Sequence, residues 1–137
     1  MARASELLGD RWTLLVLREA FYGITRFEDV RADIDAPRAA LSQRLAKLVR
    51  EKIMVKSPYR DPGDRQRFEY RLTEKGRGLA YVLIALMQWG DAHLRDDPAP
   101  LELRDAASGK ALKLALVTPD GRERPLSAVR QVVRGKK

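Results

Sequence analysis

The strongest constraint on the fold is the segment from residue 25 to residue 72, in which two helical patterns precede two strand patterns. Thr25 and Glu28 have the spacing of a capping box, in which each side chain accepts a hydrogen bond from the other residue's backbone N–H. The break at 35–37 limits this first helix, because the residue before a proline disfavours helix. The apolar residues on one face of the helix are Phe27, Val30 and Ile34.

A second helix is expected from Pro37 to Lys52, since proline suits a first helical turn. Leu41, Leu45 and Leu48 recur at helical spacing and predict its buried stripe. The opposite face carries small, amide and cationic side chains, which suit the major groove of DNA better than a protein surface. These residues are Ala39, Gln43, Ala46, Lys47 and Arg50, with Arg38, Ser42 and Arg44 on the flanks.

Two short strand patterns follow, at 53–56 and 68–72, and a turn-rich loop joins them. A cationic hairpin tip beside a basic helix is typical of a wing that meets phosphate or the adjacent minor groove. The expected fold class is therefore mostly α with a small β wing, a winged helix-turn-helix. The charged residues of the loop are Arg60, Arg65 and Arg67, with Asp61 and Asp64 among them.

The net charge of +8 points to a polyanionic partner, and most of it lies in one segment. Residues 38–67 contain nine Lys or Arg and three Asp or Glu, a net charge of +6. The charge alone could equally belong to a basic surface that faces only solvent. Its placement on both the second helix and the hairpin tip favours nucleic acid, so double-stranded DNA is the expected partner.

Composition excludes several kinds of site. The chain has no cysteine and a single histidine, His93, so it offers no disulfide, thiol sensor or multi-histidine metal site. It has no Gly-rich phosphate loop and no nucleophile elbow, so we expect neither an enzyme nor a cofactor. No apolar run approaches the roughly 18 residues of a membrane span, and the N-terminus shows no signal-peptide pattern. A cytoplasmic protein without membrane contact is expected.

The flanking helices carry more apolar surface than one small domain needs. One helix is expected from a cap at Asp10 to a stop at Gly23, and a long one from a cap at Thr73 to about Leu94. Surplus apolar surface usually meets another subunit, so we expect a homodimer formed through the terminal helices. A pocket for a small hydrophobic effector is the alternative. The residues of this dimer interface or pocket are Trp12, Tyr81, Met87 and Trp89.

A change of composition at 96–100, Asp-Asp-Pro-Ala-Pro, divides the chain. A DNA-binding and dimerisation domain is expected over 1–95 and a small β-rich extension over 96–137. Leu112, Leu114 and Leu116 alternate with other residues, which predicts two or three short strands. The extension is too short to own a core, so it should pack on the helical body or on the partner subunit, and it ends in a frayed basic tail at 135–137.

Five short motifs recur in order along the chain: LGDRWTLLVLRE (8–19), RF (26–27), PR with LSQRL (37–45), YRLTEKG (70–76) and WG (89–90). With these motifs the chain resembles, from Ala2 to about Leu94, the HxlR-type family of bacterial transcription regulators, relatives of the MarR group. The resemblance implies a homodimeric winged helix that binds palindromic promoter DNA. It also implies that Ser42, Gln43 and Arg44 lie on the helix entering the major groove, and that Arg26 starts the supporting helix.

Three departures from the family pattern stand out. Many relatives carry a sensing cysteine just before the first helix, and this chain has none, so either its start is truncated or it senses something else. Ala36 stands where a serine cap is usual, which should weaken the recognition helix by about 1 kcal/mol unless Asp35 substitutes. The extension after Pro100 lies outside the core pattern of the family.

The expected function is a sequence-specific transcriptional regulator, a repressor, acting as a homodimer on palindromic promoter DNA. The alternative is a winged-helix module that binds RNA or a protein through its basic face. RNA-binding surfaces usually expose stacking aromatics, and here only Tyr59 at the wing base would serve. The residues expected to contact DNA are Arg26, Arg38, Ser42, Gln43, Arg44, Lys47, Arg50, Arg60, Arg65 and Arg67.

Overall fold

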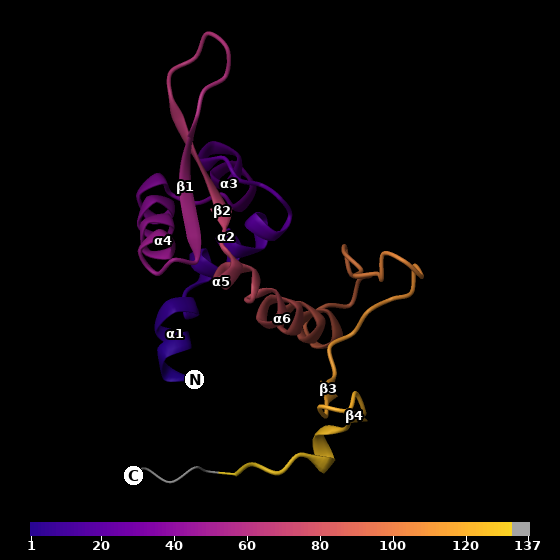
Figure 1. Ribbon diagram of the computed structural model, residues 1–137. Helices are drawn as coiled ribbons and strands as arrows, with labels where there is room; N and C mark the ends of the chain where they lie inside the picture. Colours follow the sequence, from indigo (N-terminus) through magenta and orange to yellow (C-terminus); the bar gives the residue numbers. More distant parts are fainter. Residues whose placement is uncertain (133–137) are drawn as a thin grey trace, which may run out of the picture. The chain divides into compact units, whose positions relative to one another are not determined.

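The computed structural model describes residues 1–132, so the basic tail expected at 135–137 lies outside the described residues. Contacts divide the chain into one compact unit over Met1–Leu83 and another from Ile84 onward. No helix among the described residues is long and apolar enough to cross a membrane. The first unit contains, in order, α1 (Ala2–Leu8), α2 (Arg11–Phe21), α3 (Phe27–Ile34), α4 (Arg38–Arg50), β1 (Met54–Tyr59), β2 (Arg67–Leu72) and α5 (Glu74–Arg77), followed by the start of α6 (Ala80–His93) (Figure 1).

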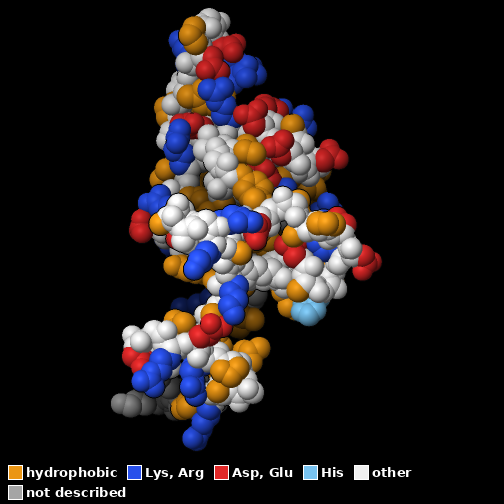
Figure 2. Space-filling model, turned by 90° about the vertical axis from the view of Figure 1, so that its right-hand side faces the viewer, with side chains coloured by type: hydrophobic (Ala, Val, Ile, Leu, Met, Phe, Trp, Pro, Cys, Tyr) orange, Lys and Arg blue, Asp and Glu red, His pale blue; other side chains and the backbone are white. Residues whose placement is uncertain are grey.

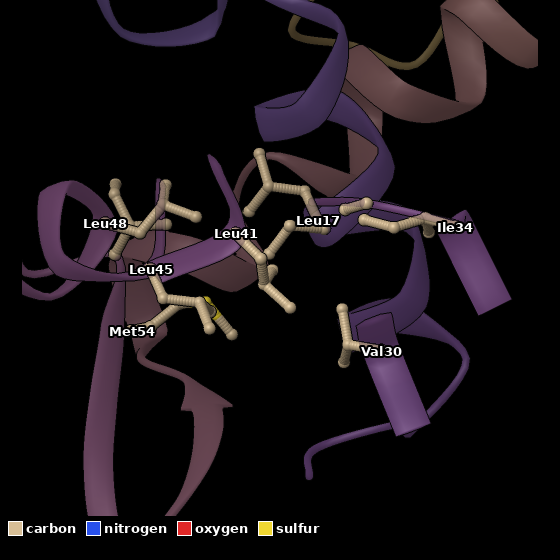
Figure 3. Close-up of a cluster of buried hydrophobic side chains, with 10 residues drawn as sticks. Leu17, Val30, Ile34, Leu41, Leu45, Leu48 and Met54 are labelled. Carbon is tan, nitrogen blue, oxygen red and sulfur yellow. The ribbon is translucent and has the colours of Figure 1, made fainter. Parts of the chain in front are cut away.

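The core of this unit lies between α2, α3, α4 and the start of β1 (Figure 3). The predicted stripe of α4 is confirmed, because Leu41, Leu45 and Leu48 are at most 1% exposed. Full burial of such a side chain contributes about 1.5–3 kcal/mol, so these leucines fix which face of α4 points outward. The residues that pack with them are Val16, Leu17, Val30, Ile34, Ala36, Ile53 and Met54.

The turn between α3 and α4 is as sharp as Pro37 predicts. Asp35 adopts a left-handed conformation (φ 50°, ψ 44°) and ends α3, and Ala36 is buried at 3% exposure. Pro37 precedes α4, and no side chain caps that helix. Asp35 therefore does not replace the missing serine cap.

The predicted capping box at the start of α3 is wrong. Residues 25–26 are extended instead, because the Tyr70 N–H donates to the Thr25 carbonyl and Arg26 forms a β-bridge with Glu69. The Thr25 hydroxyl donates to the Glu69 carboxylate at 3.2 Å. Pairing with the edge of β2 thus replaces the local cap, and α3 begins at Phe27.

The wing is an antiparallel hairpin of β1, β2 and the loop 60–66 (Figure 1). Both strands are longer than expected, since β1 continues through Pro58 to Tyr59 and β2 begins at Arg67. Pro58 lies opposite Phe68 in the register. A proline is tolerated there because a two-stranded sheet has only edge strands.

The long helix expected from Thr73 to Leu94 is interrupted. Thr73 does act as a cap, accepting from the Gly76 N–H at 3.0 Å, but the helix it starts ends at Arg77. Gly76 is buried against the Ile53 carbonyl, and a Cβ on it would lie 2.2 Å from that oxygen. A turn at 78–79 then precedes α6.

In the second unit the described part of the extension forms short hairpins and one helical turn. β3 (Leu116–Val117) pairs with β4 (Glu123–Arg124), a single bridge joins Arg104 and Ala111, and a 3₁₀ turn η1 covers Leu126–Ala128. The alternating leucines at 112, 114 and 116 are all exposed, so their alternation does not create a buried face.

One side chain of α6 holds the extension by main-chain hydrogen bonds. The Gln88 amide donates to the Leu112 carbonyl at 3.0 Å, and its oxygen accepts from the Leu114 N–H at 2.9 Å. These contacts lie within the second unit, because the second half of α6 belongs to it.

Candidate nucleic-acid interface

The outward face of α4 is accessible and carries few apolar atoms. With the leucine stripe buried, the side chains left exposed are short, polar or cationic. Side chains of this kind let a helix approach base edges closely. We call this set the reading face: Arg38, Ala39, Ser42, Gln43, Ala46 and Arg50.

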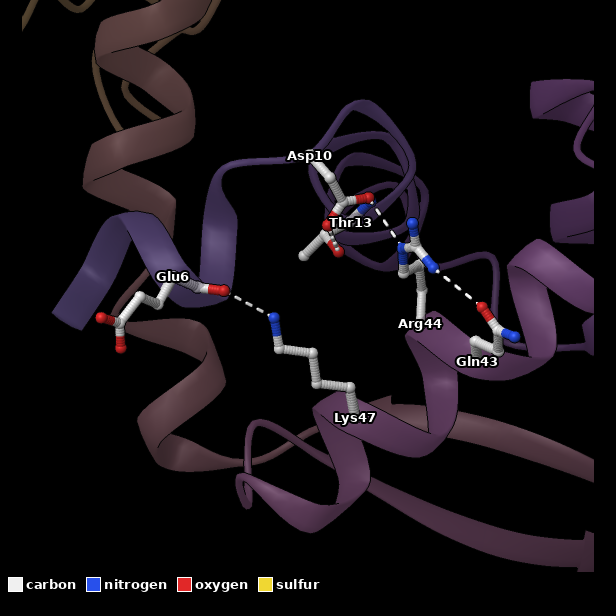
Figure 4. Close-up of polar contacts among 6 residues, drawn as sticks. All are labelled: Glu6, Asp10, Thr13, Gln43, Arg44 and Lys47. Atoms are coloured by element: carbon white, nitrogen blue, oxygen red, sulfur yellow. Dashed lines mark hydrogen bonds and ion pairs between the residues drawn. The ribbon is translucent and has the colours of Figure 1, made fainter. Parts of the chain in front are cut away.

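Two cations expected on this face are directed away from it, toward the junction of α1 and α2 (Figure 4). The Arg44 guanidinium lies 2.9 Å from the Asp10 carboxylate, and the Lys47 ammonium donates to the Glu6 carbonyl at 2.6 Å. Glu6 is in the last turn of α1, where an unpaired carbonyl attracts a cation. Arg44 and Lys47 therefore hold α4 against the N-terminal helices.

Asp10 joins this contact to the start of α2. Its carboxylate caps the helix, as predicted, by accepting from the Thr13 N–H at 3.1 Å and the Thr13 hydroxyl at 2.6 Å. Burial raises the pKa of Asp10, but hydrogen bonds from Thr13 and Arg44 outweigh burial, so the pKa lies below its usual value. The sequence pointed to Asp10 only as a cap, because its pairing with Arg44 joins residues 34 positions apart.

Arg38, at the first turn of α4, is paired with α3. Its guanidinium lies 2.5 Å from the Glu28 carboxylate and 5.2 Å from the centre of the Phe27 ring. Glu28 also accepts from Arg31 at 3.2 Å. The hydrogen bond from Arg38 is the main cause that lowers the pKa of Glu28. Glu28, expected as a cap, instead orients an arginine of the reading face.

Arg26 is paired with the wing. Both terminal guanidinium nitrogens lie 3.1 Å from the two Asp61 oxygens, and the guanidinium carbon lies 4.3 Å from the centre of the Tyr59 ring. The hydrogen bond to Asp61 raises the pKa of Arg26. A second wing arginine, Arg67, lies 3.5 Å from Asp64 within the same hairpin.

Cations without a carboxylate partner form the remaining group. Within residues 1–132, Arg50, Arg60 and Arg65 are exposed and make no ion pair. At the wing tip, uppermost in Figure 2, basic and acidic side chains lie next to each other. The ten residues expected to contact DNA thus fall into four groups. They are the paired arginines (Arg26, Arg38, Arg67), the arginines without an ion pair (Arg50, Arg60, Arg65), the residues that hold α4 against the N-terminal helices (Arg44, Lys47) and the uncharged residues (Ser42, Gln43).

The four aromatic and methionine residues expected at a dimer interface or pocket are divided between the two units, with Trp12 and Tyr81 in the first and Met87 and Trp89 in the second. Trp12 packs partly buried against the core. Tyr81 is 70% exposed and Trp89 57% exposed, and the Trp89 ring lies 5.3 Å from that of His93. Two surface depressions among the described residues are lined by residues within 23–33 and within 58–66.

A family model described as "HxlR-like helix-turn-helix" matches residues 7–98. The uncharacterized HTH-type transcriptional regulator Rv3095 of Mycobacterium tuberculosis is 46% identical over 111 residues, which are 80% of this chain and 69% of the relative. The uncharacterized HTH-type transcriptional regulator YvaP of Bacillus subtilis is 30% identical over 101 residues, 73% of this chain and 90% of the relative.

Solved structures agree with this assignment. The crystal structure of PA1607, named as a candidate transcription factor, superposes with a TM-score of 0.82 at 33% identity and covers 98% of this chain and 93% of that one. PA1374 from Pseudomonas aeruginosa gives a TM-score of 0.68 at 30% identity and covers 98% and 90%. The family model matches the part of the chain that carries the sequence motifs, and the solved structures share the winged helix-turn-helix architecture. The chain belongs to the HxlR-like helix-turn-helix family, a family of transcriptional regulators and not of enzymes.

Proposed function

We propose that this chain is a cytoplasmic, sequence-specific repressor that binds palindromic promoter DNA as a homodimer. The observation that carries the proposal is the reading face of α4, which is exposed, polar and cationic beside a wing with free arginines. Two such helices in a dimer would enter successive major grooves about 34 Å apart on one side of the duplex.

The exposure and pairing of each side chain suggest its role. Gln43 and Ser42 are exposed and uncharged, and a glutamine amide matches the adenine edge. Arg50, Arg60 and Arg65, without carboxylate partners in the described residues, supply phosphate contacts and salt-dependent affinity. Arg38, oriented by Glu28, reaches a guanine or a phosphate at the helix start.

Selection from a randomised duplex library at two salt concentrations tests the proposal. The expected product is a palindrome with half-sites one helical turn apart. Gln43→Ala should cost roughly 1–3 kcal/mol at one base position and relax preference there, whereas Arg65→Ala should weaken binding to all sequences alike. Diffuse, salt-sensitive recovery would refute sequence reading, and stronger binding to a structured RNA competitor would favour an RNA-binding winged helix.

The homodimer is supported by the apolar surface of α6. None of its residues is buried in the chain, and Tyr81, Val82, Leu86 and Trp89 are each more than 40% exposed. Association of two copies through this surface would remove it from water. Tyr81→Glu and Trp89→Glu should each yield a monomer by sedimentation velocity, with unchanged helix content, if the surface is the interface. The proposal also includes a small hydrophobic effector, which would bind the same apolar surface of α6.

A further inference from the structure

The wing is fastened to the helical body at two levels. At its base, main-chain hydrogen bonding between Thr25 and Tyr70 and the bridge between Arg26 and Glu69 add an extended segment to the edge of β2. Nearer the tip, the Arg26 side chain binds Asp61 with two hydrogen bonds of 3.1 Å. Among the described residues this is the ion pair that joins loop 60–66 to the residue preceding α3.

The geometry of the second attachment is more specific than that of a typical surface ion pair. A bidentate arginine–carboxylate pair fixes direction as well as distance. The guanidinium also lies 4.3 Å from the Tyr59 ring, so the cation is held between the carboxylate and an aromatic face. Tyr59 ends β1 and Asp61 follows two residues later, so the contact sets the direction in which the chain leaves the strand.

We infer that Arg26 is a positioning residue that acts through Asp61 to hold the wing arginines in place for DNA, and not a direct phosphate ligand. This inference rests on the proposed DNA-binding function. Arg60 precedes Asp61 in the chain, so fixing the Asp61 carboxylate limits where the Arg60 side chain can reach. A loop ordered before binding loses less freedom on association, which raises affinity for a site that matches its geometry.

The wing supplies a matched pair of variants for the test. Asp61→Asn and Asp64→Asn each remove one negative charge from the same loop, but only Asp61 pairs with the helical body, whereas Asp64 pairs with Arg67 in the hairpin. Removal of the charge should strengthen binding to random duplex in both variants. Asp61→Asn alone should reduce the ratio of specific to random affinity, by roughly 2- to 10-fold, the factor for ordering one long side chain.

The variant Arg26→Gln tests whether Arg26 acts through Asp61. If the two side chains act as one unit, the ratio in the double variant Arg26→Gln/Asp61→Asn should equal that in either single variant. If Arg26 touches phosphate itself, its replacement will weaken binding to every duplex even when residue 61 is asparagine. That result would overturn the inference.

A measurement without DNA separates this inference from the proposed function. Amide hydrogen exchange at residues 60–66 of the free protein should accelerate in Asp61→Asn and Arg26→Gln and stay unchanged in Asp64→Asn. Equal exchange in all variants would overturn the inference even if the protein reads a palindrome. If the variants exchange faster as expected but the wild-type protein prefers no duplex sequence, the inference about the Arg26–Asp61 pair stands and the proposed DNA-binding function is refuted.

Discussion

Replacement of Asp10 by alanine should destabilise the first unit by about 2–5 kcal/mol. Loss of a helix cap costs about 1 kcal/mol. Thr13 is fully buried, and the Asp10 carboxylate accepts its hydroxyl hydrogen, so the variant leaves a buried donor unpaired at a cost of about 1–3 kcal/mol. The ion pair with Arg44 is about one-third exposed and adds at most about 1 kcal/mol.

Urea unfolding followed by tryptophan fluorescence measures this loss, because Trp12 lies in α2 beside the cap. With a slope of about 1–3 kcal/mol per molar urea, the midpoint should fall by roughly 1 M or more. Asp10→Asn keeps one oxygen that can accept from the Thr13 N–H, and its amide nitrogen can donate to the Thr13 hydroxyl in place of the lost acceptor, so its midpoint should move less far. Asp33→Ala is the control, because Asp33 is an exposed residue of α3 that caps no helix. Equal losses in Asp10→Ala and Asp10→Asn would refute the capping argument.

Three further predictions concern stability. Gly76→Ala should lower the unfolding free energy by about 1–3 kcal/mol in urea, because its Cβ would meet the Ile53 carbonyl at 2.2 Å, whereas Gly90→Ala, with open space around the Cβ, should be tolerated. Leu45→Ala should cost about 2–5 kcal/mol through the cavity it leaves in a fully buried site, measured in the same way. The pKa of Asp10 is lowered by folding, so its stabilisation is complete above the ordinary value of 3.8 and is lost as pH falls through the lower folded-state pKa. Unfolding free energies at several values between pH 5 and pH 2 should therefore decline more steeply for the wild type than for Asp10→Asn.

Local patterns in the sequence predicted the elements that depend on local physics. The leucine stripe of α4, the cap at Asp10 and the turn at Pro37 follow from spacing and residue type within a few positions, and the structure confirms them. The capping box at Thr25 failed because a strand more than 40 residues away pairs with the same backbone. The tertiary pairing of residues 25–26 with β2 thus overrode the local capping-box pattern.

The side-chain directions in the candidate interface were not readable from the sequence for the same reason. A helical wheel places Arg44 and Lys47 near the exposed side of α4, but it contains no information about the α1–α2 junction that binds them. Glu28 and Asp61 likewise became partners of arginines only when α3, α4 and the wing were brought together. The sequence thus indicated the charge of the surface, while the structure indicates which charges are already neutralised.

The hold of Gln88 on residues 112–114 uses the peptide groups of the extension and none of its side chains. A carboxamide that donates to one carbonyl and accepts from an amide two residues on reproduces the hydrogen-bonding pattern of a neighbouring strand. Such an attachment is indifferent to residue identity at 112 and 113, and at 114 it excludes only proline, which lacks the N–H. Substitutions in the extension can therefore accumulate without loss of these two hydrogen bonds, whereas a single change at position 88 would remove both.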